Sequence, residues 1–133
     1  MTMRFPGRAA MLGVILLGTT AMQPARAPLP LLDGLEPGRW ELRGEGNAMI
    51  GAVCLGDPAQ LVQVQHSGQN CRHLLLTADR RSLAVRYTCP GTGFGRTNIL
   101  VETPRLARID SQGIAGGVPF QMRLEARRTG PCR

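Results

Sequence analysis

Apolar and polar residues alternate with a period of two along most of the chain after residue 38. The pattern is clearest near the C-terminus, where Val118, Phe120, Met122, Leu124 and Ala126 alternate with mainly polar residues. Such alternation is typical of strands that are buried on one face. Apolar runs bounded by turn residues predict about seven short strands, at 39–43, 48–55, 72–78, 82–89, 95–103, 106–111 and 118–127.

One segment departs from this pattern. Asp57-Pro58 is a helix start, because aspartate caps free N–H groups and proline fits the first helical position. We expect a short helix over 59–65 and turns at 111–113 and 116–117. Short links between neighbouring strands favour antiparallel pairing. The predicted fold is therefore mainly β, a curled antiparallel meander sheet or small barrel with one short helix.

The N-terminus has the pattern of a cleavable secretion signal. Arg4 and Arg8 precede an apolar run of about ten to thirteen residues, which is shorter than the roughly 20 that a membrane-spanning helix needs. We therefore expect residues 1–27 to be a signal peptide and residues 28–133 to be a single β-rich domain. This interpretation places the protein in the periplasm, with no transmembrane segment after signal removal.

The cleavage point has two candidates. Ala25-Arg26-Ala27 fits the small-residue rule, but the ring of Pro28 should hinder a peptidase at the next bond. The alternative is cleavage after Ala21. No cysteine precedes Cys54, so we expect a soluble product and not a lipoprotein.

The four cysteines, Cys54, Cys71, Cys89 and Cys132, predict disulfides, because an even count in a small exported chain is typical of oxidised pairs. Three pairings are open. We favour Cys54–Cys71, because a helix that leaves and returns to the same sheet edge brings these residues together. The second pair is then Cys89–Cys132, which would tie down the C-terminus.

Five short motifs follow one another along the chain: Pro37-Gly38-Arg39-Trp40-Glu41, Cys54-Leu55, Cys71, Tyr87-Thr88-Cys89 and Gly130-Pro131-Cys132. Together they make the chain similar to a family of exported proteobacterial proteins known as domain of unknown function 3617. The resemblance covers essentially the whole chain after the signal. It implies a β-rich periplasmic domain with disulfides, and it implies no activity.

Candidate chemistry gathers around two histidines. His66 and His73, with Cys54 and Cys71, make the ligand set of a zinc site. An exported thiol is more often oxidised, so we favour a disulfide flanked by exposed histidines. A cysteine–histidine nucleophile pair meets the same objection and has no evident group to orient the imidazole. We therefore expect no metal, no cofactor and no catalytic residues.

Residues 91–96 resemble a phosphate-binding glycine loop. Arg96 stands where a dinucleotide fingerprint needs its third glycine, and the chain has no lysine for a Walker loop. A strand, and not a helix, is expected after this segment. We therefore interpret it as a hairpin loop.

The arginines give one further hypothesis. Signal removal leaves 13 arginines against nine acids, which lowers the net charge from +7 to +4. Arg86, Arg123 and Arg127 should point outward from strands, with Arg105 and Arg108 near strand ends. They form a candidate surface for an anionic ligand, since arginine forks fit phosphate and carboxylate. Ordinary solvation of the strand faces is the simpler explanation. A modest charge and few aromatic residues argue against nucleic acid.

Our leading hypothesis is a non-enzymatic binding or accessory domain of the cell envelope, with its ligand in the mouth or concave face of the curled sheet. An envelope lipid, a polysaccharide or a periplasmic protein would be the partner. A second hypothesis is an inhibitor of a cell-wall hydrolase, because small lysozyme inhibitors are also disulfide-bonded β-barrels and Tyr87-Thr88-Cys89 resembles them. A third is an enzyme that uses His66 or His73. The oligomeric state stays open.

Overall fold

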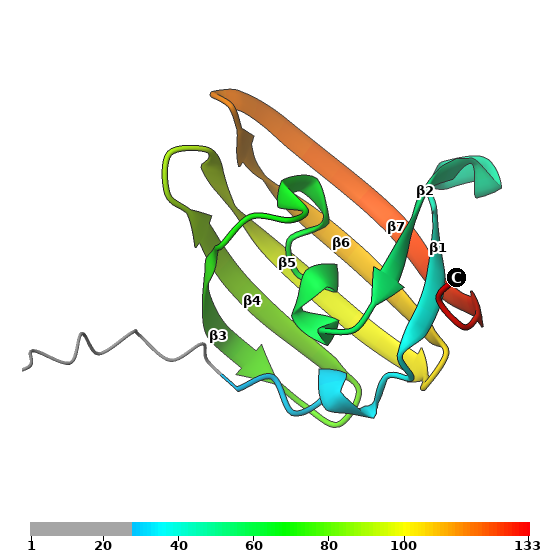
Figure 1. Cartoon of the computed structure of the whole chain (residues 1–133). Helices are drawn as coiled ribbons and strands as arrows, with labels where there is room; N and C mark the ends of the chain where they lie inside the picture. Colours follow the sequence, from blue (N-terminus) through cyan, green and yellow to red (C-terminus); the bar gives the residue numbers. More distant parts are fainter. Residues whose placement is uncertain (1–27) are drawn as a thin grey trace, which may run out of the picture.

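The structure, a computed structural model, describes residues 28–133, so the predicted secretion signal lies outside the described residues. The fold is mainly β, as predicted, and its strands belong to one antiparallel sheet (Figure 1). The seven strands are β1 (Gly38–Arg43), β2 (Met49–Leu55), β3 (Arg72–Ala78), β4 (Ser82–Cys89), β5 (Gly93–Thr103), β6 (Leu106–Ala115) and β7 (Val118–Gly130).

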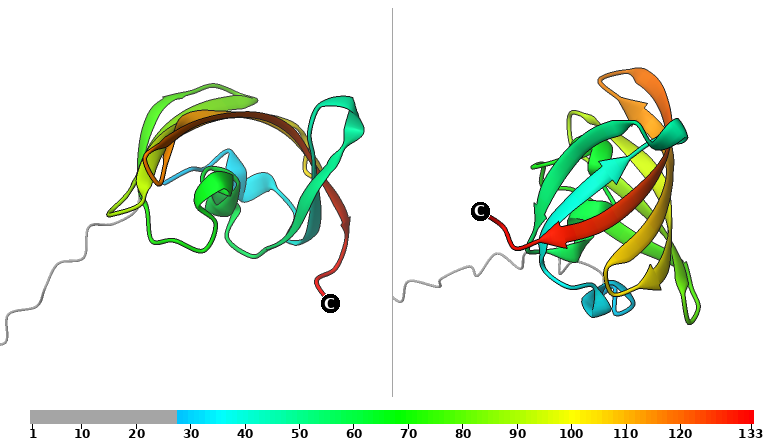
Figure 2. Two further views of the ribbon diagram at one scale, coloured as in Figure 1. Left: turned by 90° about the horizontal axis from the view of Figure 1, so that it is seen from above. Right: turned by 90° about the vertical axis from the view of Figure 1, so that its right-hand side faces the viewer.

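The strand order is β2-β1-β7-β6-β5-β4-β3. Strands β3 to β7 form a meander, and β7 then pairs with β1 from the start of the domain. The sheet curls into an arch but does not close, which leaves β2 and β3 as its two edges (Figure 2). Of the two predicted architectures, the curled sheet is confirmed and the closed barrel is not formed.

A connection over residues 56–70 crosses the concave side of the arch between the two edge strands (Figure 2). The helix expected over 59–65 is instead two short 3₁₀-helices, η3 (Pro58–Leu61) and η4 (Val64–His66). Its predicted start is confirmed, because the Asp57 carboxylate accepts a hydrogen bond from the Ala59 N–H at 2.9 Å. The helix breaks at Gln63, whose side-chain amide bonds two nearby carbonyls.

The core lies between the sheet and this connection. Trp40, Val85 and Tyr87 are fully buried on the inner face, where Leu61 and Val62 of the connection meet them. The proline-rich arm before β1 also contributes. It holds a 3₁₀-helix, η1 (Leu32–Gly34), and its leucines at 29, 32 and 35 are buried. A further 3₁₀-turn, η2 (Glu45–Asn47), joins β1 to β2.

The turn expected at 111–113 is not formed, and β6 runs on to Ala115. Ser111 was interpreted as a turn residue, but it faces the core, where its hydroxyl lies 2.8 Å from that of Thr97. This hydrogen bond lets a polar residue occupy a buried strand position. The chain reverses at Gly116-Gly117, as predicted, and both glycines have positive φ. Within residues 28–133 no helix has the length and apolar character needed to cross a membrane.

Two disulfides brace the sheet, but the pairing we favoured is wrong. The bonds are Cys54–Cys132 and Cys71–Cys89. We assumed that the chain returns to the same edge after β2, whereas it crosses to the opposite edge. Cys71 therefore lies beside Cys89 in the β3–β4 hairpin, next to the pair Arg72 and Thr88. The C-terminal tail passes β1 and reaches Cys54 on β2.

Candidate anion-binding surface

The three arginines of the predicted ligand surface do not act together. Arg123 and Arg127 point outward from β7, but each has an acidic partner: Arg123 Nε lies 3.2 Å from an Asp110 carboxylate oxygen, and Arg127 Nη2 lies 3.0 Å from Glu125. Arg86 points outward from β4, and no ion pair involves it among the described residues. Of the three predicted arginines, only Arg86 therefore remains a candidate for binding an anion.

The remaining predicted arginines are also paired. Arg105 Nε lies 2.8 Å from a Glu36 carboxylate oxygen, and Arg108 Nε lies 2.9 Å from Glu102. The hydrogen bond and charge of Glu102 raise the pKa of Arg108. These pairs are exposed, so they fix side-chain positions more than they stabilise the fold. They also make those arginines poor candidates for an external anion.

Sequence reasoning missed the partner of Arg86. Arg96 on β5 lies directly opposite it in the antiparallel register. Both side chains are exposed, and among residues 28–133 no acid forms an ion pair with either. Like charges directly opposite each other in a sheet are unfavourable. The sequence does hold a signal for this pair: residues 91–96 were interpreted as a hairpin loop, and a short turn between Cys89 and Gly93 sets the β4–β5 register.

The Arg86–Arg96 pair lies at an open hollow of about 700 Å³ on the outer face of the sheet. Phe94, which is 51% exposed, and Ile114 line the same hollow. Guanidinium groups offer fixed N–H forks that match phosphate or carboxylate oxygens. The arrangement therefore provides two positive charges and an apolar wall for an anionic group.

A second hollow, of about 520 Å³, lies on the outer face near η2. Its charged lining residues alternate in sign, and Arg108 and Arg123 contact Glu125 and Asp110 within it. Its cations are thus largely neutralised by acids on neighbouring strands. This hollow has no net preference for an anion, which distinguishes it from the one beside Arg86.

The concave face, where we expected a ligand, is filled. Leu61 and Val62 are fully buried there, and Leu32 of the N-terminal arm is 1% exposed. These side chains occupy the space between the sheet and the two segments that pack on it, the connection and the N-terminal arm, because the sheet must bury its inner apolar face against some element. A ligand in the concave face would therefore have to displace buried side chains.

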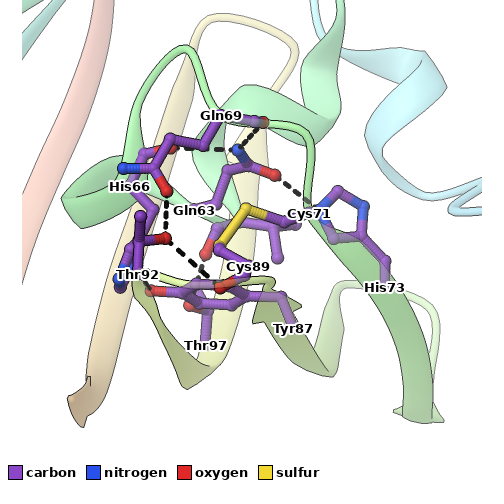
Figure 3. Close-up of a disulfide and its surroundings, with 10 residues drawn as sticks. Gln63, His66, Gln69, Cys71, His73, Tyr87, Cys89, Thr92 and Thr97 are labelled. Atoms are coloured by element: carbon purple, nitrogen blue, oxygen red, sulfur yellow. Dashed lines mark hydrogen bonds between the residues drawn. A yellow bond between two sulfur atoms is a disulfide. The ribbon is translucent and has the colours of Figure 1, made fainter. Parts of the chain in front are cut away.

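The two histidines are buried, contrary to the expectation that they are exposed. His66 Nδ1 lies 3.1 Å from the Tyr87 hydroxyl, and His73 Nε2 lies 2.8 Å from the Gln63 side-chain oxygen (Figure 3). Both histidines face inward because the connection and the inner face of β3 pack against each other. Cys71 is bonded to Cys89 beside them (Figure 3). Among residues 28–133 no group of histidines, cysteines and acids is placed to hold a metal.

This buried cluster fastens the connection to the sheet. The Thr97 hydroxyl on β5 donates to the Val62 carbonyl at 2.5 Å, and the Gln63 amide donates to the Gln69 carbonyl at 2.7 Å. Burial raises the pKa of Tyr87, with a smaller opposing effect from a hydrogen bond to Ser111. A Cβ at residue 95 would lie 2.6 Å from the Tyr87 ring, so a glycine there lets the tyrosine pack flat on β5. The cluster has the features of a structural polar network.

Comparison with known proteins adds the family. No curated protein and no solved structure matches the chain. Residues 35–132, which hold the whole sheet and both disulfides, match the family described as Protein of unknown function (DUF3617), and the chain belongs to that family.

Proposed function

We propose that this protein is an exported, non-enzymatic binding domain of the cell envelope that holds an anionic ligand between Arg86 and Arg96. One observation carries the proposal. Two arginines face each other across β4 and β5 without an acidic partner in the described chain, at a hollow that Phe94 also lines. An anion bound between them would relieve their repulsion and add charge-assisted hydrogen bonds.

Export is supported by two independent features. The first 27 residues have the charge and hydropathy pattern of a secretion signal. The four cysteines form two disulfides, which persist in oxidising compartments such as the periplasm. Phosphate- and carboxylate-bearing lipids and polysaccharides are the anions that an envelope supplies.

A role in binding, and not in catalysis, is supported by the location of the reactive side chains. His66 and His73 are 2% and 8% exposed and are hydrogen-bonded inside the core. The sulfur atoms are bonded to one another. The side chains that line the hollow beside Arg86 offer guanidinium, hydroxyl, amide and apolar groups, which bind anions but are poor proton-transfer groups at neutral pH.

The proposal is tested by NMR titration of the disulfide-bonded domain, residues 28–133, with sodium pyrophosphate. We expect amide shifts to concentrate on β4 and β5 around Arg86 and Arg96, and to disappear in the double variant Arg86→Gln/Arg96→Gln. The matched control is Arg123→Gln/Arg127→Gln, which removes the same charge from the same face but from arginines paired with acids. Unchanged spectra, or shifts that persist in the Arg86→Gln/Arg96→Gln variant, would overturn the proposal.

A further inference from the structure

We infer that the anion is carried by a lipid bilayer, and that the protein docks on an anionic membrane surface through one end of its outer face. This inference rests on the proposed function. The docking surface, which we call the tip face, consists of Arg86, Phe94, Arg96, Ile114 and Pro119. It lies at the end of the sheet that carries the β4–β5 loop and the β6–β7 hairpin (Figure 1).

The apolar part of the tip face is a cross-strand row. Phe94 on β5 pairs with Ile114 on β6, which pairs with Pro119 on β7. Phe94 is 51% exposed, and Val118, which is next to Pro119 but on the other face of the hairpin, is 64% exposed. The β6–β7 hairpin projects beyond the neighbouring strands in Figure 1 and in the right-hand view of Figure 2. Large apolar side chains on a projecting hairpin can enter the boundary between headgroups and acyl chains without disturbing the fold.

The basic part of the tip face lies directly behind this row. Arg96 is two residues from Phe94 on the same strand and the same face, a spacing of about 7 Å. Arg86 stands beside it on β4. Arg72 on β3 lies opposite Thr88, in the row of Phe94, and adds a third exposed arginine next to the tip face. When the apolar row enters a bilayer, arginines at this distance reach the level of the lipid phosphates.

The charge of the tip face favours an anionic membrane over an uncharged one. None of the nine acids of the chain lies in the row of Phe94 or in the row of Arg86. Asp110, one row further from the tip, is paired with Arg123. A bilayer rich in phosphatidylglycerol therefore meets uncompensated positive charge at the tip face and nowhere else on the paired β5–β7 surface.

The opposite end of the outer face provides the contrast. There, Arg108 contacts Glu102 and Glu125, and the second hollow has acids among its lining residues. The outer face is thus polarised: one end is apolar and basic, whereas the other end is charge-balanced. This polarity gives the protein a single orientation on a surface, with the β6–β7 hairpin toward the membrane.

The test is co-sedimentation of the disulfide-bonded domain, residues 28–133, with vesicles of phosphatidylethanolamine and phosphatidylglycerol, compared with vesicles of phosphatidylcholine. We expect binding to the anionic vesicles only, weakened by added salt. Each arginine near an anionic surface is worth about fivefold in partitioning, so Arg86→Gln/Arg96→Gln should weaken binding roughly 25-fold. Phe94→Ser should weaken it as well, since its exposed ring is the main apolar contact. Arg123→Gln/Arg127→Gln is the matched control, since it removes the same charge from arginines paired with acids, and it should bind as the unaltered protein does.

The outcomes separate the two proposals. If the anionic vesicles do not bind while pyrophosphate still shifts the β4 and β5 amides, the membrane inference is wrong and the anion site stands. Equal binding by the unaltered protein, Arg86→Gln/Arg96→Gln and Phe94→Ser, or equal binding to phosphatidylcholine, would also overturn the inference. If neither vesicles nor pyrophosphate bind, both proposals fail. Because the altered side chains are exposed, near-UV circular dichroism should show that each variant folds as the unaltered protein does.

Discussion

The Cys54–Cys132 bridge should contribute more to stability than the Cys71–Cys89 bridge. The first joins cysteines 78 residues apart, and the second joins cysteines 18 residues apart. In the chain-entropy model these loops correspond to about 4.5 and about 3.2 kcal/mol at 25 °C. Cys54 and Cys132 are exposed, so replacing both with serine removes little packing. The variant Cys54→Ser/Cys132→Ser should therefore lose about 4–5 kcal/mol in the free energy of unfolding.

Equilibrium urea unfolding followed by tryptophan fluorescence measures this loss. Trp40 is the only tryptophan, it is fully buried, and it lies on β1 beside the strand that carries Cys54. The comparison variant is Cys71→Ala/Cys89→Ala. Its loop contribution is smaller, but both cysteines are 2% exposed, so a packing loss is added.

Two results would refute this reasoning. A loss below about 1 kcal/mol for Cys54→Ser/Cys132→Ser would show that the long loop does not govern the contribution of the bridge. Non-reducing peptide mapping that finds Cys54 joined to Cys71 would reject the pairing itself. In that case the strand order, which places β2 and β3 at opposite edges of the sheet, would also be wrong.

Three further predictions concern the connection over residues 56–70, the β3–β4 turn and the N-terminus. Leu61→Ala should lower the free energy of unfolding by about 2–5 kcal/mol in urea titrations, because the side chain is fully buried. A loss under about 1 kcal/mol would show that the connection is loosely packed against the sheet. Hydrogen bonds from the Ser82 hydroxyl and the Arg81 and Ser82 N–H groups lower the pKa of Asp79 below 3.8. Its stabilisation is therefore fully present above pH 3.8 and is lost as the pH falls through the lower folded-state pKa. Asp79→Asn should lack this acid-dependent component, and unfolding curves that change equally with pH in both proteins would contradict the assignment. Mass spectrometry of the exported protein should find Pro28 or Met22 at its N-terminus, whereas a chain that begins at Met1 would refute export.

Local periodicity was enough to predict the strands and their faces. In β4, Leu83, Val85 and Tyr87 are buried and Arg86 is exposed, as the alternation predicts. The Asp57-Pro58 helix start was also predictable, because a cap depends on neighbouring residues alone. The number of strands followed from turn residues, which act over a few positions.

The strand order was not predictable, because it depends on contacts between distant segments. A helix that returns to the same sheet edge would have made β2 and β3 neighbours, whereas the chain places them at opposite edges and pairs β1 with β7. The wrong disulfide pairing follows from this one difference. The burial of His66 follows from it as well, since a connection that joins opposite edges must cross the concave face.

The position of the binding surface follows from the same crossing. Leu61 and Val62 are buried at the concave face, which is why the proposed ligand site lies on the outer face. On that face, composition alone identifies too many arginines, and only the register shows which of them have acids beside them. Arg123 stands opposite Asp110, whereas Arg86 stands opposite Arg96. A single-residue shift of β5 against β4 would turn Arg96 toward the core. The proposed anion site therefore depends on the hairpin turn that sets this register as much as on the two guanidinium groups.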